Sequence, residues 1–319
     1  MRVCITGGSG TLGYYLQRLL SQQHDFEVLS LLRRESSSTH KYPNITTTRI
    51  DFSDHSAFKK IVRDFKPGAI VHAAASGMKQ SERSRWLEMT AFNLQSTLGL
   101  LEAAAELSDC HYIYVSTGLA YLPQRRPLVE GDPLGSTHPY GACKAATDLL
   151  VRSGADSLGV SLTVFRPFSF TGVNDHTTRL FPTVLKAAAT GTPAQLTDGN
   201  QVRDFSAAED VAEAILLALR RRAEPGAVKC VSVYNLGSGN LLPLRQVLEH
   251  VMCDLGLRVE IRFTAEGAER PAPVMLTANT SAAREELAWR PRVSLSYAVW
   301  ELARSTYPDL ATRQPPKWL

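Results

Sequence analysis

Residues 3–13 read VCITGGSGTLG, and this stretch decides the fold. A short apolar run leads into glycines at every third position, and a helical pattern of apolar residues begins inside the motif. At a strand–helix junction such glycines allow a tight turn and let backbone N–H groups approach a pyrophosphate, and the last one permits close helix–strand packing. The stretch therefore predicts a dinucleotide site contacted by Gly7, Gly10, Thr11, Leu12 and Gly13. The alternative is an ordinary glycine-rich turn.

Outward from the motif, β-branched runs alternate with amphipathic stretches. Strands are predicted at residues 2–5, 27–32, 47–50, 69–74, 111–116, 161–166 and 232–236, and helices at 11–23, 56–65, 86–107, 140–153 and 209–222. This alternation predicts an α/β fold: a Rossmann-like doubly wound parallel sheet with a smaller mixed α/β C-terminal substrate-binding lobe. Proline and glycine break the pattern after Arg166. We therefore assign residues 1–166 and about 206–238 to the dinucleotide-binding domain, and about 167–205 and 239–319 to the lobe.

Composition excludes several classes of protein. The 319 residues are 44% hydrophobic and 21% charged, with a formal net charge of +4 and no long basic run, so nucleic acid binding is not indicated. The five cysteines form no CxxC pair, which argues against a metal site and against a disulfide framework. Because we find no leader peptide and no apolar stretch of about 20 residues, we expect a soluble, cytoplasmic protein without membrane contact.

The end of the second predicted strand indicates which dinucleotide is bound. NAD sites usually place an acidic residue there to bond the ribose 2′-hydroxyl. Here Arg33 and Arg34 stand in that place, and guanidinium groups form bidentate bonds with a 2′-phosphate. The pair favours NADP(H); the alternative is that both arginines are solvated and Glu35 binds the ribose of NAD(H). Asp51 and Phe52, after the third strand, are expected beside the adenine, unless Asp51 only caps the next helix.

Tyr140 and Lys144 lie four residues apart in a predicted helix and so share one face. An ammonium beside a phenol favours the phenolate and lowers the tyrosine pKa, which suits proton transfer near neutral pH. Ser116 and Thr117 end a predicted strand, where open α/β sheets bind ligands. By itself this spacing also fits a partly buried tyrosine beside a lysine that reaches solvent, so the surrounding motifs decide.

These motifs and several later ones stand in the order typical of the extended short-chain dehydrogenase/reductase family, which the sequence resembles along nearly its whole length. Members of that family mostly act on nucleotide-activated sugars. The matching stretches are residues 5–13 (ITGGSGTLG), 71–75 (VHAAA), Asn93 with 99–104 (GLLEAA), 115–117 (VST) before Tyr121, 139–144 (PYGACK), 166–168 (RPF) with 171–172 (TG), 198–205 (DGNQVRDF) and 287–291 (LAWRP).

The resemblance implies a role for each matching residue. Tyr140 would be the general acid/base, Lys144 would hold the nicotinamide ribose and tune Tyr140, and Thr117 would bond the reacting oxygen. On the cofactor side the resemblance adds Ala73, Ala74, Ala75, Pro167 and Asn93, the last as a structural or cofactor-side residue. On the substrate side it adds Ser116, Ser169, Arg203 and Arg270; the alternative for the two arginines is a salt bridge with Asp204 and Glu269. It also implies a homodimer built from the helices around 86–107 and 140–153.

Three departures from the family pattern select among its reactions. Gly118 and Leu119 stand where sugar dehydratases have an Asp–Glu pair, which argues against dehydration. Ser169 replaces the usual asparagine, and Arg33 with Arg34 replaces the acidic end of the second strand. Substrate choice is expected in the loops at 76–87, 118–126 and 173–180.

We therefore expect an NADPH-dependent reductase that delivers hydride to the ketone of a nucleotide-linked 4-keto-6-deoxy sugar while Tyr140 donates the proton. The first alternative is an NAD-dependent nucleotide-sugar 4-epimerase, which would use the same residues without net redox change. A non-catalytic dinucleotide-binding sensor is a more distant alternative, because it would not need Thr117, Tyr140 and Lys144 together. The expected partner is a small-molecule nucleotide sugar, with no metal ion.

Overall fold

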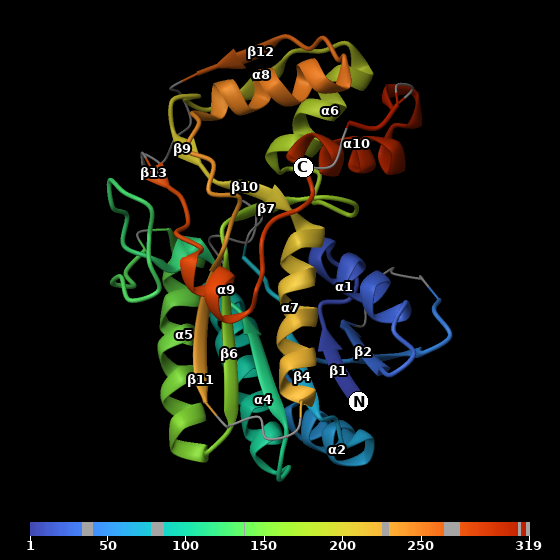
Figure 1. Ribbon diagram of the computed structural model, residues 1–319, viewed down its shortest axis with the longest axis vertical. Coiled ribbons are helices and arrows are strands. Elements are labelled where there is room, and N and C mark those ends of the chain that lie inside the picture. Colours follow the sequence, from blue (N-terminus) through green and yellow to red (C-terminus); the bar gives the residue numbers. More distant parts are fainter. Residues whose placement is uncertain are drawn as a thin grey trace.

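The computed structural model describes residues 1–33, 41–77, 86–136, 138–224, 230–264, 275–311 and 314–316, and a parallel sheet runs through its centre (Figure 1). The strand order is β11 (Val231–Leu236), β6 (Ser161–Pro167), β5 (His111–Val115), β4 (Ala69–His72), β1 (Arg2–Thr6), β2 (Glu27–Arg33) and β3 (Ile45–Ile50). The first strand, β1, lies inside the sheet, and later strands are added on both sides of it. This order confirms the predicted Rossmann-like α/β class. The order reverses between β1 and β4, where such sheets bind ligands.

Helices cover both faces of the sheet because the strands carry apolar side chains on both faces. Val3 and Ile5 of β1 pack in one core with α1 (Thr11–Ser21), α7 (Ala208–Ala223) and α9 (Ser281–Glu286). Cys4 packs in the other core with α2 (His55–Phe65), α4 (Ser96–Ala105) and α5 (Pro139–Leu158). The carboxyl ends of the strands are left uncovered by these helices and are available for a site.

A smaller group of elements lies beyond the carboxyl ends of the strands (Figure 1). Helices α6 (Leu180–Thr190), α8 (Leu244–Leu255) and α10 (Leu295–Thr306) share a separate apolar core. Three short parallel pairs accompany them: β10 (Phe205–Ala207) with β7 (Ser169–Thr171), β12 (Ile261–Phe263) with β8 (Ala194–Leu196), and β13 (Met275–Leu276) with β9 (Val202–Arg203).

The helix predicted over residues 86–107 is interrupted. The structure has α3 (Trp86–Thr90), a π-helical turn (Ala91–Gln95) and then α4. Asn93, inside the wide turn, donates from Nδ2 to the carbonyl oxygens of Met89 and Ser76, at 2.9 and 2.8 Å, and accepts from the Ser76 nitrogen at 2.9 Å. Apolar periodicity does not reveal such a turn, because the side chain that occupies it is polar and bonds to a distant loop.

None of the helices in the segments given above is long and apolar enough to cross a membrane. In the same segments, no three His, Cys, Asp or Glu side chains gather in a way that would hold a metal ion.

Buried His111 makes the fold sensitive to acid. At the start of β5, its Nδ1 lies 3.0 Å from Ser161 Oγ and its Nε2 lies 3.0 Å from Thr163 Oγ1. Burial lowers the pKa of His111 from 6.5 to about 4. The unfolded chain therefore binds the proton first as the pH falls, and this histidine costs the folded state stability between pH 6.5 and about 4.

We expect the free energy of unfolding in urea to fall less steeply between these pH values in a His111→Gln variant than in the unchanged protein. The difference should reach up to about 3 kcal/mol, because each unit of pKa shift corresponds to about 1.4 kcal/mol. A His24→Gln variant, altered at an exposed position, should keep the original pH dependence. Parallel curves for the protein and the His111 variant would contradict the expectation.

Candidate active site

A cavity of about 390 Å³ opens at the carboxyl ends of the central strands. Residues that are far apart in the chain meet in its wall. Those predicted from the sequence are Gly7, Gly10, Thr11, Leu12, Gly13, Arg33, Phe52, Ala73, Ala74, Ala75, Ser116, Thr117, Tyr140, Pro167 and Ser169. Lys144, Asp51, Asn93 and Arg203 are not part of the wall, and Arg34 and Arg270 lie outside the described residues.

The first strand–helix turn is so tight that no side chain fits at Gly7 or Gly13. Gly7 has φ +79°, and a Cβ there would lie 2.7 Å from the backbone nitrogen of Ala74. A Cβ on Gly13 would lie 2.2 Å from the carbonyl oxygen of Gly7. Helix α1 therefore begins directly at the cavity, with Gly10 and Thr11 in the wall. In this arrangement the N–H groups of the first turn are placed to bind a pyrophosphate.

Arg33 and two phenylalanines form the end of the cavity next to β2. Phe52 stacks on Phe92 with ring centroids 5.2 Å apart and an interplanar angle of 24°. The guanidinium carbon of Arg33 lies 5.5 Å from the centroid of the Phe92 ring. Flat aromatic and guanidinium surfaces suit an adenosine. Phe92 was not predicted from the sequence, because it lies in the π-helical turn that the apolar periodicity does not reveal.

Asp51 is not part of this wall, and its expected contact with adenine stays a prediction. Its carboxylate accepts from the Ser53 nitrogen at 2.9 Å and from Ser53 Oγ at 2.6 Å, which makes it a turn-forming residue. Because Arg34 and its alternative Glu35 lie outside the described residues, the structure describes Arg33 alone of this charged run.

The loop after β4 is held by polar side chains. Thr6 Oγ1 lies 2.7 Å from His72 Nδ1 and accepts from the Ala74 nitrogen at 3.2 Å. These bonds place residues 73–75 in the wall of the cavity. Asn93 bonds to Ser76 at the far side of the same loop, so it supports the loop and does not line the cavity.

Tyr140 and Lys144 lie in the first turns of α5, and both are buried. Tyr140 is in the cavity wall. Lys144 Nζ donates to the Val115 carbonyl at 2.6 Å and lies 4.2 Å from the centroid of the Tyr114 ring. Burial lowers the pKa of Lys144 to about 7. Burial raises the pKa of Tyr140, and the positive charge of Arg179 acts in the opposite direction.

Two hydroxyl groups stand at the end of β5, in the same wall as Tyr140. Thr117 Oγ1 accepts from the Leu119 nitrogen at 3.2 Å, which leaves its own proton available for donation. Ser116 is 3% exposed, and its Oγ has no hydrogen-bond partner in the part of the chain that the structure describes. A buried hydroxyl that faces a cavity without a partner is placed to bond a ligand.

A buried ion pair fixes α5 against the sheet. Arg166 of β6 donates from Nε and Nη2 to the two carboxylate oxygens of Asp148, each at 2.8 Å, and the two side chains are 1% and 0% exposed. Arg166 Nη1 donates to Tyr121 Oη at 2.8 Å, and Tyr121 in turn donates to Asn235 Oδ1 at 2.7 Å. Arg166 and Tyr121 belong to the family motifs in the sequence, whereas Asp148 was not predicted.

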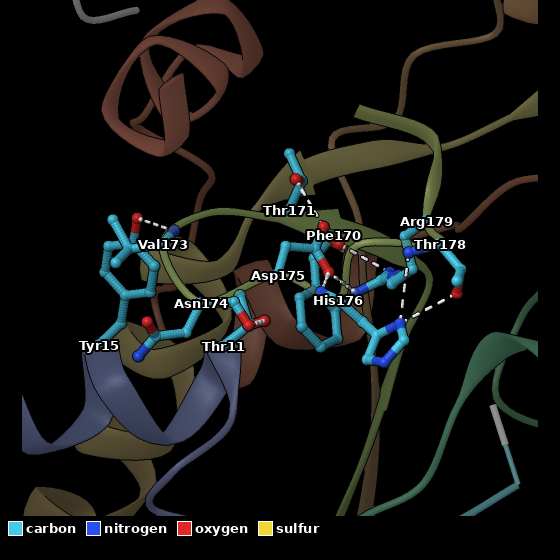
Figure 2. A network of polar contacts seen from close by, with 10 residues as sticks. All are labelled: Thr11, Tyr15, Phe170, Thr171, Val173, Asn174, Asp175, His176, Thr178 and Arg179. Atoms are coloured by element: carbon cyan, nitrogen blue, oxygen red, sulfur yellow. Dashed lines mark hydrogen bonds and ion pairs between the residues drawn. The ribbon is translucent and has the colours of Figure 1, made fainter. Parts of the chain in front are cut away.

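The loop of residues 172–179, hereafter the Asp175 loop, is tied to α1 at its start (Figure 2). Thr11 Oγ1 donates to the Asn174 carbonyl at 3.0 Å, and the Val173 nitrogen donates to Tyr15 Oη at 3.0 Å. Tyr15 Oη donates in turn to Glu301 Oε2 of α10 at 2.7 Å. The first helix and the last long helix of the described chain therefore hold the loop together.

Asp175 organises the rest of this loop (Figure 2). Its carboxylate accepts from Thr171 Oγ1, the His176 nitrogen and Arg179 Nη1, each at 2.8 Å. Arg179 Nη2 also donates to the Phe170 carbonyl at 2.8 Å. Asn174, Asp175, His176 and Arg179 all line the cavity. Substrate choice was expected in this loop, but none of these four residues was predicted; the available signal was a polar run directly after a strand end.

Arg203 does not line the cavity, and within the described segments it forms no salt bridge with Asp204. The Asp204 carboxylate instead accepts from the nitrogens of Ser238, Gly239 and Ala278, at 2.6, 3.1 and 3.1 Å. Burial lowers the pKa of Arg203 to about 10, and its Nη1 has no partner within the described segments. Arg270 and Glu269 lie outside those segments.

The wall of the cavity fits a nicotinamide dinucleotide part by part. The glycine turn offers N–H groups for the pyrophosphate, and Arg33 with the stacked rings offers a surface for adenosine. Tyr140, Ser116 and Thr117 line the same cavity.

Comparisons with known proteins agree with this geometry. Residues 3–237 match the model of the NAD dependent epimerase/dehydratase family. The UDP-glucose 4-epimerase of Streptomyces lividans is 30% identical over 305 residues, 90% of each chain, and that of Lactobacillus helveticus is 26% identical over 311 residues, 92% of each chain. Among solved structures, the UDP-glucuronic acid 4-epimerase of Bacillus cereus, in complex with UDP-glucuronic acid and NAD, superposes with a TM-score of 0.84 at 20% identity, covering 96% of this chain and 98% of that one.

Proposed function

Since the chain belongs to the NAD dependent epimerase/dehydratase family, we propose that it is an NAD-dependent 4-epimerase of a UDP-linked hexose. Both curated relatives described above are UDP-glucose 4-epimerases, and the similar solved structure holds NAD. These findings support the epimerase alternative better than the leading expectation of a 4-keto-sugar reductase. They also give no support to the preference for NADP(H) that Arg33 and Arg34 suggested.

One observation carries the proposal: Tyr140 and two strand-end hydroxyls line the same cavity as the glycine turn. The glycine turn and Arg33 would hold NAD, whose nicotinamide would supply a reversible acceptor for the hydride at C4 of the sugar. The Tyr140 phenolate would take the proton of the C4 hydroxyl as that hydride leaves, so that a ketone forms. Thr117 and Ser116 would hold the ketone oxygen, which carries negative charge in the transition state. Inversion then requires that the ketone present its other face before Tyr140 returns the proton.

The proposal is tested with the protein as purified, without added cofactor. UDP-glucose, UDP-galactose and UDP-glucuronic acid are supplied separately, and the C4 epimers are followed by NMR. We expect one substrate to reach a mixture of epimers without net formation of NADH, and near-stoichiometric NAD to appear on denaturation. Release of NADP, with oxidation of added NADPH by a nucleotide-linked 4-keto sugar and no epimer formed, would instead establish the reductase.

We further propose that each of the two predicted domains binds one of the two ligands. Residues 1–166 and about 206–238 would bind the dinucleotide, and about 167–205 and 239–319 would bind the sugar nucleotide. In support, the elements of the first group pack on the central sheet, whereas α6, α8 and α10 share their own core; α9 of the second group departs from this division, because it packs in the core of the sheet with α1 and α7.

We also propose that two copies pair through α5 and α3. Leu149 and Leu150 of α5 are 52% and 47% exposed, and Trp86 and Leu87 of α3 are also exposed apolar side chains. Light scattering is expected to give twice the 35.0 kDa of one chain, and Leu150→Glu should give a monomer, because a charge would be buried at the contact. Leu241→Glu, a change at an exposed leucine outside these helices, should leave the dimer intact. A monomeric unaltered protein would refute the pairing.

A further inference from the structure

Tyr15 of α1 holds the Asp175 loop from outside the cavity. Its side chain is 1% exposed and is not part of the cavity wall. Tyr15 Oη accepts from the Val173 nitrogen at 3.0 Å, as Figure 2 shows, and donates to Glu301 Oε2 at 2.7 Å. One hydroxyl thus joins the start of the loop to α10, and its proton and one lone pair are both used.

The backbone at the start of the loop also lies directly against the Tyr15 ring. A Cβ on Gly172 would lie 2.5 Å from Cε2 of Tyr15 and 2.7 Å from its Oη. Since no side chain fits between the loop and the ring, the position of the ring determines where the loop can lie. Close packing at Gly172 and a hydrogen bond at Val173 therefore act on successive residues of the loop.

Charged side chains hold Tyr15 in its turn. The guanidinium carbon of Arg18 lies 4.7 Å from the centroid of the Tyr15 ring. Arg18 Nη1 donates to Glu301 Oε1, and Arg18 Nη2 donates to Glu209 Oε1 of α7, each at 2.7 Å. Glu301 therefore binds Tyr15 with one carboxylate oxygen and Arg18 with the other. The contacts of α1, α7 and α10 fix the phenol in one orientation.

The loop that Tyr15 holds forms part of the cavity wall. The four loop residues in the wall are Asn174, Asp175, His176 and Arg179. They belong to residues 167–205, the part of the chain expected to bind the sugar nucleotide, whereas Tyr15 belongs to the part expected to bind the dinucleotide. A residue of one predicted domain thus sets the position of a wall segment of the other.

We propose that Tyr15 is a positioning residue for the sugar nucleotide: its hydroxyl keeps the Asp175 loop in the conformation that binds this substrate. The identity of the substrate rests on the proposed function, whereas the effect on the loop does not. Without the hydroxyl, the loop would occupy the binding conformation for only a fraction of the time, and the apparent affinity would fall by that fraction. Such a loss raises KM and leaves kcat unchanged, because it acts before the substrate is bound.

The test compares the NAD-loaded protein with a Tyr15→Phe variant, which keeps the ring and removes the hydroxyl. We expect hydrogen exchange of the backbone amides at residues 173–179 to become at least about tenfold faster. The Kd for UDP, measured by calorimetry, and the KM for the UDP-hexose that the protein epimerises should rise about tenfold, while kcat changes less than about twofold. The amount of NAD released on denaturation should stay the same.

Tyr234→Phe is the matched control. Tyr234 Oη donates to Glu286 Oε2 at 2.8 Å between β11 and α9, so this variant loses a bond of the same kind outside the cavity wall. Loop exchange, Kd and KM should stay unchanged in it. If Tyr15→Phe loses its near-ultraviolet circular dichroism, Gly172→Ala provides the same test from the side of the loop, because the added Cβ forces the loop away from the ring.

Unchanged loop exchange would overturn the proposal, and so would faster exchange with unchanged Kd and KM, which is the result expected of a bond that only stabilises the fold. Loss of NAD from the variant, or a kcat that falls more than KM rises, would also overturn it. Faster exchange and weaker UDP binding in a protein that epimerises no sugar would overturn the proposed function and leave the role of Tyr15 standing. A failure of the unaltered protein to bind UDP would overturn both.

Discussion

Replacing Tyr140 by phenylalanine is expected to reduce kcat for C4 epimerisation by about 10²–10⁴-fold, while NAD stays bound. The ring is buried in the first turn of α5, and phenylalanine preserves that packing. Only the hydroxyl that exchanges the proton with the sugar is lost. Turnover is measured by NMR of the epimers, and NAD is quantified after denaturation.

A tyrosine far from the cavity provides the control. Tyr307, which follows α10, packs against the core of α6, α8 and α10, so Tyr307→Phe should keep both turnover and NAD. If the Tyr140 variant retained more than about a tenth of the original kcat, another group would have to serve as general acid/base. If it lost its NAD, the residue would be needed to hold the cofactor, and the assignment of its role would change.

The largest effect on stability is expected from Asp148→Ala, which should lower the free energy of unfolding in urea by about 3–5 kcal/mol. Asp148 is 0% exposed and binds two nitrogens of Arg166, which is itself 1% exposed. Without the carboxylate, a guanidinium would remain buried with only Tyr121 and the Glu130 carbonyl as partners. An uncompensated buried charge is what makes the loss of one partner so costly.

Two control substitutions near Asp148 distinguish the loss of the buried ion pair from the effect of removing a surface charge. Arg152 also contacts Asp148, but its side chain is 33% exposed, so Arg152→Ala should cost no more than about 1 kcal/mol. Asp156→Ala, at an exposed position of the same helix, should change stability by less than about 0.5 kcal/mol. A similar loss of unfolding free energy in all three variants would show that α5 tolerates no substitution. The result would contradict a specific contribution of the ion pair to stability.

The central sheet could be predicted because its signals are local. The strands are apolar runs bounded by turns, and the glycine turn has a spacing that few other structures require. The predicted strand over residues 69–74 ends at His72, because Ala74 turns to bond Thr6 of the neighbouring strand. Local sequence patterns do not predict such contacts between distant segments.

For the same reason the sequence could not decide between the alternatives at the site. Asn93 bonds the backbone of Ser76, which agrees with the structural alternative, and Asp51 bonds the Ser53 nitrogen within a turn. Asp148 carries no signal, since an acidic residue on an amphipathic helix normally faces water. The loop residues His176 and Arg179 reach the cavity only because Asp175, Tyr15 and Glu301 fix the backbone that bears them.

The bond between Tyr15 and Glu301 also affects the order in which the chain folds during its synthesis. Its two residues are 286 positions apart, so a ribosome that adds about 5–20 residues per second needs roughly 15–60 s to produce the second after the first. During that interval the glycine turn and its neighbouring strands can already pack, and the Asp175 loop can bond Thr11 and Tyr15, while Tyr15 still lacks its partner on α10. A nascent chain therefore acquires the half that takes up the dinucleotide, with Tyr140 and Thr117, well before the last helix that fixes this loop.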